Sequence, residues 1–579
     1  MSKTGKKLNP WNIVLLFLGV AISLFATYKT IYYGYDIDES YAITLSYRLV
    51  MGDHLFKEMW EVHQTSAIFM APFIWIYRHV VGTTIGMVVF LRAVGCVIQL
   101  LVAIALYHSL SKHIDKVSSC VIAFIFYNFS PKYLNVLEFC FLQYLFMTLI
   151  LIFLLYYFDS PKKRYLFLVG ICLAGTVLAY PQTVLLFPAE YMILAFMFIE
   201  KEGATTSLKN LLYVFTGEAI CGILFLAYVL KNVTLVELFR NIPMVLADQS
   251  HSIDATEKVI ALLTELWQKS YFLILIFIVY EIACFLYRKT KGKEPSYAKE
   301  LCLFFIWVFW IVPFMLHDEQ PGICHLDTFY LIFSECIGIG YLNLRTKKPH
   351  AMAGILRMMQ LLLLCIVMGA SVSSNLWLYA NGGLLLPVTF PIWAEYILNR
   401  TVEEEESAVT ARRKKAGMAL LVSAALAFML ARCTLVRFTA LHQETVFSKL
   451  HQISIGTAKD IYATEKEHVQ YHSKMAALQQ YVGVEDTLLY LGSDAYLYFL
   501  IGNQVGVSTS ISTPAFDQTM VEYYERYPYK TPNIIFADKY YVNLNKIQYE
   551  GEFGKWLRQN YDLEHVIDDD WVQIIYRKQ

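Results

Sequence analysis

The sequence has little charge. Asp, Glu, Lys and Arg together make up 17% of its 579 residues, whereas a typical soluble chain carries about 25%. Hydrophobic residues make up 57%, and the mean hydropathy is +0.45. Apolar runs of about 20 residues, long enough to cross a hydrocarbon core, recur along the first three quarters of the chain. These features exclude an ordinary soluble protein and indicate a multi-pass membrane protein.

Several short motifs are also missing. None of the eleven cysteines follows Cys433, which excludes a disulfide framework in the C-terminal region, and no two have the C-x-x-C spacing of a metal site. The basic N-terminus precedes an apolar run without a small-residue cleavage site. We therefore expect the first segment to be a retained helix rather than a signal peptide.

Thirteen apolar segments predict thirteen spans, and basic residues in the short connections predict their orientation. With the N-terminus in the cytoplasm, the inner connections contain 24 Lys and Arg residues, and the outer ones before residue 433 contain 8. Because cytoplasmic loops are enriched in Lys and Arg, we expect the C-terminal region to lie outside. The predicted spans are 12–33, 84–110, 117–130, 139–158, 165–180, 183–200, 210–230, 271–287, 300–316, 327–344, 354–372, 383–399 and 416–432.

Two outer connections are long. The first covers about residues 34–83 and contains the apolar stretch Thr65–Val81. We interpret this stretch as a juxtamembrane or re-entrant helix, because a further span would reverse the alternation of the loops. The connection 231–270 contains two amphipathic stretches, Leu235–Leu246 and Thr256–Trp267, and we expect it to act as a lid.

After the last predicted span, the composition becomes that of a soluble domain. We expect a helix over residues 440–482, and strands at Thr487–Leu491, Asn533–Phe536 and Trp571–Tyr576, between turns that contain Gly, Pro and Asn. The predicted fold is thus an α-helical polytopic membrane domain over residues 1–432, followed by a small extracytoplasmic α/β domain over residues 433–579.

An acidic motif lies where the first apolar segment would leave the membrane. Residues 33–41 read Tyr-Gly-Tyr-Asp-Ile-Asp-Glu-Ser-Tyr and place Asp36, Asp38 and Glu39 at the lipid–water boundary. Carboxylates there are costly unless they face water, a cation or a reacting group. One interpretation is that they mark the end of the helix. The other is that one of them is a general base that takes a proton from an acceptor hydroxyl while a lipid phosphate leaves.

A phosphate leaving group needs cations or hydrogen-bond donors close by. An isolated His or Arg at such a boundary is also commonly an anchor to lipid headgroups. The candidates on the outer side are His63, Lys132, Arg240, His317 and His325.

The N-terminal motifs resemble those of a known family. They are residues 38–55 (Asp-Glu-Ser-Tyr-Ala-Ile-Thr-Leu-Ser-Tyr-Arg-Leu-Val-Met-Gly-Asp-His-Leu), 60–69 (Trp-Glu-Val-His-Gln-Thr-Ser-Ala-Ile-Phe), Leu91-Arg92-Ala93 and Phe129-Ser130-Pro131. Together they resemble the first third of the GT-C membrane glycosyltransferases, in the branch of the protein O-mannosyltransferases and the lipid A aminoarabinose transferase. The resemblance implies about thirteen spans, a lid in a late external loop and an outer C-terminal domain.

The resemblance also implies residue roles. Asp38 matches the catalytic acid, Glu39 its neighbour, and His63 the His of a conserved arm. Gln64 stands where the family usually has Lys, and Thr65-Ser66 replaces Pro-Pro, so Lys132 or His325 would hold the phosphate instead. Further candidates are Glu138 in the second outer loop and Tyr180, which would contact the sugar or serve only to end its helix.

The implied activity is transfer of a sugar from a polyprenyl-phosphate donor to a cell-envelope lipid, polymer or protein on the outer face of the plasma membrane. No Gly-rich loop for a nucleotide is present, no residue pattern requires a metal or another cofactor, and nothing indicates a nucleic-acid partner. The alternatives are a transporter or flippase of lipid-linked saccharide and a non-catalytic scaffold. A transporter would have paired discontinuous helices and ionisable residues at mid-membrane, whereas the charged residues here are expected to cluster at the outer boundary.

Overall fold

The structure is a computed structural model of the chain. It describes residues 10–34, 36–114, 116–129, 135–246, 255–292, 358–359, 361–363, 365–366, 369, 449–499, 504–511, 517–544 and 551–578. The predicted spans 300–316, 327–344, 383–399 and 416–432 lie outside these residues, and 354–372 is described only in part. Thirteen spans therefore remain a prediction.

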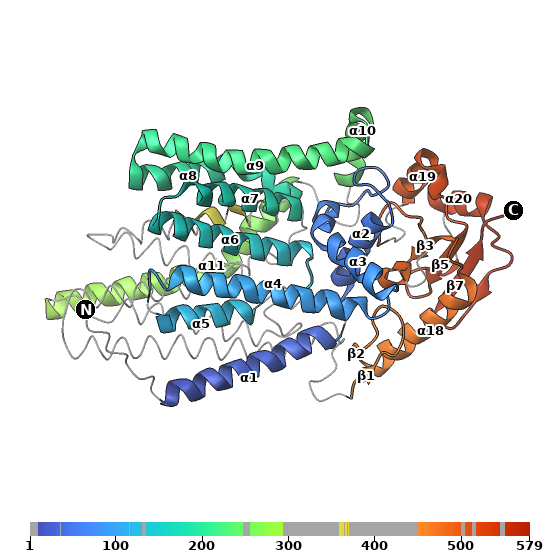
Figure 1. Cartoon of the computed structure of the whole chain (residues 1–579), viewed down its shortest axis with the longest axis horizontal. Coiled ribbons are helices and arrows are strands. Elements are labelled where there is room, and N and C mark those ends of the chain that lie inside the picture. The colour runs from blue at the N-terminus through green and yellow to red at the C-terminus, as the bar shows by residue number, and fades with distance from the viewer. Residues whose placement is uncertain are drawn as a thin grey trace.

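The N-terminal half forms a bundle of long helices that lie side by side (Figure 1). Every one of the first eight predicted spans coincides with a helix, and those predictions of helical segments are confirmed. The helices are α1 (Pro10–Tyr32), α4 (Met87–Leu110), α5 (Lys116–Tyr127), α6 (Phe139–Asp159), α7 (Lys163–Ala179), α8 (Phe187–Glu202), α9 (Ala204–Asn232) and α11 (Ala255–Lys291), with a 3-10 turn η3 (Pro181–Leu186) before α8.

Within the described residues, four helical segments are long and apolar enough to cross a membrane, which indicates a membrane protein. They are Met87–Leu110, Phe139–Asp159, Pro181–Ile199 and Ala204–Asn232. Two of them have a carboxyl group at their midpoint: Glu190 in Pro181–Ile199 and Glu218 in Ala204–Asn232. These two carboxyl groups differ in position from the charged residues expected at the outer boundary.

Helices α7 and α9 pack backbone against backbone. A methyl group placed on Gly170 of α7 would collide with the carbonyl oxygen of Val214, and one placed on Gly217 of α9 would collide with that of Phe167. Small residues at such crossings let membrane helices approach closely. The contact fixes how α9, and with it Glu218, is rotated relative to the bundle.

The first outer connection is largely helical. It contains α2 (Ile37–Val50), the short 3-10 helix η1 (Gln64–Ser66) and α3 (Ala67–Val81). Helix α3 confirms the helix predicted there and ends at Gly82, whose φ of 76° suits glycine. Helix α2 was not predicted. It is buried on most sides, so its sequence lacks the regular alternation of a polar and an apolar face that identifies an amphipathic helix.

The C-terminal region contains a five-stranded mixed sheet in the order β4-β3-β5-β7-β6. Strand β3 (Thr487–Leu491) is parallel to β4 (Gln504–Val505) and β5 (Ile534–Asp538), whereas β7 (Val572–Tyr576) is antiparallel to β5 and β6 (Ile567–Asp568). All three predicted strands are present. Helices α18 (Glu465–Tyr481), α19 (Asp517–Arg526) and α20 (Glu552–Asn560), with the 3-10 turns η4 (Ala495–Phe499) and η6 (Pro528–Lys530), complete the region.

One part of the C-terminal prediction was wrong. Within the helix predicted over 440–482, residues 451–463 contain a two-stranded ribbon, β1 (His451–Gln452) paired with β2 (Tyr462–Ala463). Helix α18 begins only after this ribbon, at a capping box formed by Thr464 and Glu467. Gly456 and Asp460, both with positive φ, form the turn that a helix could not accommodate.

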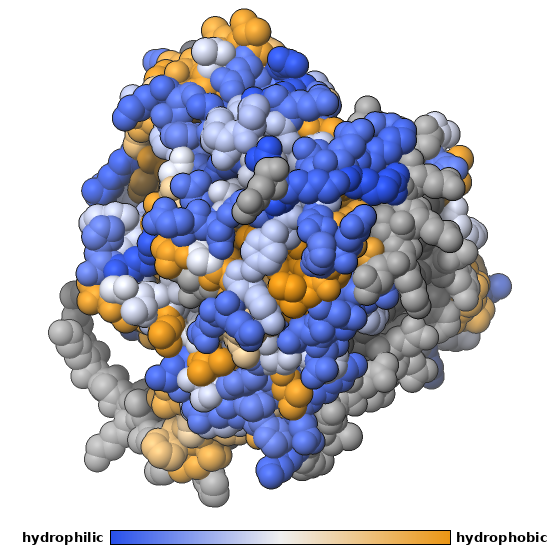
Figure 2. Space-filling view, turned by 90° about the vertical axis from the view of Figure 1, so that its right-hand side faces the viewer, coloured by the Kyte–Doolittle hydropathy of each residue, from blue (hydrophilic) through white to orange (hydrophobic). Residues whose placement is uncertain are grey.

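The C-terminal region packs directly on the bundle and shares its hydrophobic core. Backbone N–H groups of Gly34 and Gly86 donate to the carbonyl oxygens of Tyr462 and Gly456, at 2.7 and 3.1 Å. Figure 1 shows α2 and α3 between the bundle and the C-terminal strands. The end of the molecule at which the C-terminal region lies has a largely hydrophilic surface with separate hydrophobic patches (Figure 2).

Substituting Gly170 by Ala should destabilise the protein by about 1–3 kcal/mol, because the added methyl forces α7 and α9 apart. Gly222→Ala is the matched control, since a methyl on Gly222 of α9 meets nothing within 4 Å. Thermal unfolding in detergent should give a lower Tm for Gly170→Ala than for Gly222→Ala. Equal Tm values would contradict the close packing of the two helices.

Candidate functional site

Asp38 lies in the first turn of α2, directly after the chain leaves α1. Asp36 caps this helix in an extended conformation, and its Oδ1 accepts a hydrogen bond from the Asp38 N–H at 2.9 Å. The partial positive charge of a helix N-terminus stabilises an ionised carboxylate. Asp38 is half-buried. It is thus held in place yet partly accessible.

Glu39, the second acid of the motif, is fully enclosed by protein. Its Oε1 accepts from Arg92 Nε at 2.7 Å, and its Oε2 accepts from Arg92 Nη2 at 2.6 Å and from the Tyr496 hydroxyl at 2.9 Å. Arg92 also donates to the carbonyl oxygens of Ile31 and Gly34 at 2.9 and 2.6 Å. Glu39 therefore connects the end of α1, the start of α2, α4 and η4, and it positions the turn that carries Asp38.

An aromatic cluster forms where η1, α6 and α7 meet. The ring of His63 stacks on Phe139, with 4.2 Å between centroids, and meets Tyr180 edge-on at 4.8 Å. Tyr41, one turn after Asp38 on α2, meets Phe139 edge-on at 6.4 Å. The Tyr180 hydroxyl lies 3.0 Å from Cys140 Sγ. Two predicted binding residues, His63 and Tyr180, are thus in contact, and α2 reaches the same cluster through Tyr41.

Glu138 and Gln64 lie next to this cluster in sequence, but their contacts are structural. Glu138 is buried and caps α6, accepting from the N–H groups of Cys140 and Phe141 at 2.8 and 2.6 Å. Gln64 is also buried, and its Oε1 accepts from the Phe56 N–H at 2.7 Å. Both side chains hold the backbone that presents His63 and Phe139.

The remaining predicted residues are not brought to this cluster by the described structure. Arg240 is exposed on α10 (Leu235–Leu246), which matches the first amphipathic stretch of the predicted lid. The next residue, Asn241, donates to the Phe56 carbonyl and the Tyr527 hydroxyl at 2.7 and 2.8 Å. Lys132, His317 and His325 lie outside the described residues.

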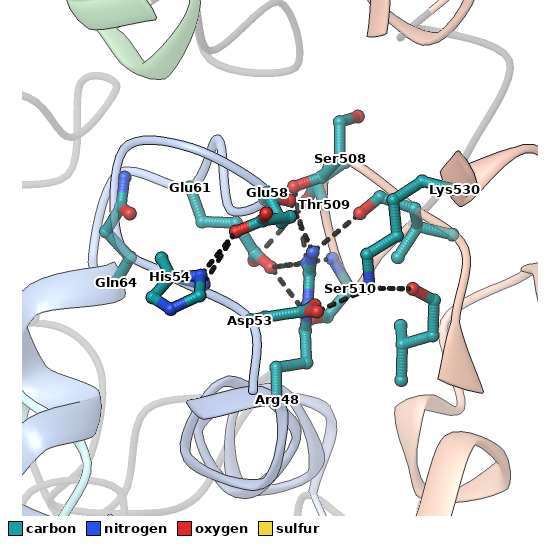
Figure 3. Close-up of polar contacts among 12 residues, drawn as sticks. Arg48, Asp53, His54, Glu58, Glu61, Gln64, Ser508, Thr509, Ser510 and Lys530 are labelled. Atoms are coloured by element: carbon teal, nitrogen blue, oxygen red, sulfur yellow. Dashed lines mark hydrogen bonds and ion pairs between the residues drawn. The ribbon is translucent and has the colours of Figure 1, made fainter. Parts of the chain in front are cut away.

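Sequence reasoning missed a buried ionic network between the first outer connection and the C-terminal region (Figure 3). Arg48, which is fully buried, donates to Asp53 at 2.8 Å, to Glu61 at 2.9 Å, and to the carbonyl oxygens of Val507 and Ser508 at 2.7 and 3.3 Å. Lys530 pairs with the other oxygen of Asp53. The one signal available was the number of charged residues between 48 and 61 in an otherwise apolar part of the chain.

The carboxyl groups of this network have different electrostatic environments. Burial raises the pKa of Glu61, and the charge of Arg48 only partly offsets it. Burial also opposes ionisation of Glu58, but hydrogen bonds from the Tyr529 hydroxyl and the His54 N–H outweigh it and lower the pKa of Glu58. Tyr41 hydrogen-bonds to Glu61. Tyr41 therefore links the network to the aromatic cluster.

The described residues bring together no group of three or more His, Cys, Asp or Glu side chains that could hold a metal ion. No protein-family model matches the chain, and no curated protein sequence matches it either. Arguments about its function therefore depend on the chemistry of its own residues.

Replacing Arg48 by Met should cost about 3–5 kcal/mol, because it leaves Asp53 and Glu61 buried without their shared cation. We expect a lower Tm and faster protease cleavage between the C-terminal region and the bundle. Arg240→Met removes an exposed Arg and is the control. A variant Arg48→Met as resistant to protease as the control would show that the network does not hold the two parts together.

Acid should weaken the protein through Glu58. Because its pKa is lower in the folded chain than the ordinary value of 4.5, its ionised form adds stability above that pH, and this stability is lost as the pH falls through the folded pKa. Glu58→Gln should cost about 1–3 kcal/mol at neutral pH. The difference in Tm from the natural chain should shrink below about pH 4.5. A difference that is constant with pH would contradict the assignment.

Proposed function

We propose that this chain is an integral-membrane glycosyltransferase that moves a sugar from a polyprenyl-phosphate donor to an acceptor on the outer face of the membrane. One observation carries the proposal: a half-buried Asp38 at a helix N-terminus, held by a neighbour whose own carboxylate is fully occupied by Arg92 and Tyr496. A general base must be positioned rigidly and still reach its substrate. Asp38 meets both requirements.

In the proposed reaction, the hydroxyl oxygen of the acceptor attacks the anomeric carbon, and Asp38 accepts the proton of that hydroxyl. The bond between that carbon and the phosphate oxygen breaks, and the polyprenyl phosphate leaves with the electron pair. The carboxylate charge of Asp38 is favoured by the helix N-terminus. The half-buried ring of His63, packed against the buried rings of Phe139 and Tyr180, is an aromatic side chain that a sugar ring could contact.

The proposal includes a topology with the N-terminus in the cytoplasm and the C-terminal region outside, over a domain of GT-C type. The excess of basic residues in the inner connections supports this orientation. The first outer connection and the C-terminal region would then enclose Asp38 at headgroup depth. The phosphate would be held by cationic side chains, with Lys132 and His325, both outside the described residues, as candidates.

A transporter of lipid-linked saccharide is the second candidate, and a specific observation favours it. Glu190 and Glu218 are at the midpoints of two candidate spans, where ionisable residues commonly mark a transport pathway. Reconstituted protein distinguishes the two functions. A transferase releases polyprenyl phosphate in detergent, without any membrane to cross, whereas a transporter moves its substrate intact across a vesicle membrane.

Asp38→Asn should reduce sugar transfer at least about 100-fold, because the amide cannot accept the hydroxyl proton. Expression and Tm in detergent should stay unchanged. Asp36→Asn is the matched control, since Asn caps a helix about as well as Asp. Transfer is measured as modified cell-envelope glycans by mass spectrometry, in cells that lack the gene and carry each variant. Full activity of Asp38→Asn would remove this residue from the mechanism.

A further inference from the structure

Two buried carboxyl groups in the bundle have no part in the proposed transfer. Glu190 lies on α8 and is fully buried, and Glu218 lies on the neighbouring α9 and is 8% exposed. Each is the midpoint of a candidate membrane span. Tyr191, the residue after Glu190 on α8, donates a hydrogen bond to Glu218, which places the two carboxyl groups in the same part of the α8–α9 contact. The inference below is independent of the proposed transferase activity.

The surroundings of the two groups are known in part. The Tyr191 hydroxyl donates to Glu218 Oε2 at 2.7 Å. Cys221 lies one turn after Glu218 on α9, and the thiol of Cys365 donates to the carbonyl oxygen of Leu186, one turn before Glu190. Among the residues that the structure describes, no Lys, Arg or His interacts with either carboxyl group. The pair therefore has no cationic side chain from this part of the chain to balance its charge.

The oxygen atoms of Glu190 are the decisive feature. Both Oε1 and Oε2 are buried and accept no hydrogen bond from any residue that the structure describes, and the same is true of Glu218 Oε1. An ionised carboxylate in a membrane interior without a partner costs several kcal/mol. Two neighbouring carboxylates in a medium of low dielectric constant do not both ionise. At least one of the two therefore has its charge neutralised.

A proton suits this site better than a metal ion. A hard metal cation takes about six or more oxygen ligands, and these two side chains with Tyr191 supply fewer. A proton needs a single oxygen. Because the Tyr191 hydroxyl stabilises negative charge on Glu218, the proton belongs on Glu190. We propose that Glu190 and Glu218 form a proton-binding site at mid-membrane, with one bound proton carried by Glu190 opposite an ionised Glu218.

Infrared difference spectroscopy on the full chain in detergent tests the protonation state directly. At neutral pH the natural chain should show the C=O stretching band of a protonated carboxyl group without hydrogen bonds, and Glu190→Gln should lack it. Glu202→Gln is the matched control on the same helix, because both oxygens of Glu202 accept hydrogen bonds, from Tyr157 and Asn210. Identical spectra for the natural chain and Glu190→Gln would overturn the proposal.

Labelling with an apolar carbodiimide gives a second measurement. The protonated carboxyl group adds across a C=N bond of the reagent: a carboxyl oxygen bonds to the central carbon, the proton moves to nitrogen, and the acyl group then migrates to nitrogen as a stable adduct. Peptide mapping should find the adduct on Glu190 and not on Glu202. Labelling should fall as the pH is raised, because only the protonated carboxyl group reacts.

Two further labelling experiments show whether the site binds a proton or a metal cation. In Tyr191→Phe, which removes the hydroxyl donor of Glu218, the adduct should spread to Glu218. Excess sodium at constant pH should leave the labelling of Glu190 unchanged. If sodium suppresses the labelling, the site binds a metal cation rather than a proton, and the proposal is wrong.

Discussion

A guanidinium group that is cut off from water must be surrounded by acceptors, and this requirement organises the half of the molecule where α1, α2 and the C-terminal region meet. Arg92 is fully buried inside a candidate span, and its donors reach Glu39 and the carbonyl oxygens at the end of α1. Since these acceptors come from the end of α1 and from the first turn of α2, the pairing fixes where α1 stops and where α2 begins. Losing either partner would leave the other as an uncompensated charge in a dry site.

Arg48, in the last turn of α2, is also fully buried and surrounded by acceptors. It reaches Asp53 and Glu61 within the first outer connection, and the backbone of residues 507–508 in the C-terminal region. Arg92 binds the acidic motif through Glu39, and Arg48 binds α2 to residues 507–508 of the C-terminal region. Together the two arginines hold these segments in one core. This framework places Asp38, which is half-buried, whereas Glu39 is fully buried.

Much of the fold was predictable, since apolar length and strand propensity are local properties. The first eight span predictions fall on helices, and Leu235–Leu246 and Thr487–Leu491 are exact. Helix α2 was missed because its burial is nearly uniform, and the β1–β2 ribbon because its strands are only two residues long. Within the site, the sequence indicated Asp38, His63 and Tyr180, but pairings such as Glu39 with Arg92 depend on tertiary contacts that no local pattern encodes. Glu190 and Glu218 lie near the middle of the predicted spans 183–200 and 210–230, so their position was predictable, but not their approach to each other across α8 and α9.

The partners of the first outer connection come from the last part of the chain to be synthesised. Tyr496 follows Glu39 by 457 positions, and Lys530 follows Asp53 by 477. A ribosome completes these residues only after every helix of the bundle has emerged. Until then, the acidic turn lacks Tyr496, and the Arg48 network lacks its distant acceptors. A polypeptide released early from translation would therefore display unsatisfied buried charges, a state that cellular quality control can recognise and degrade.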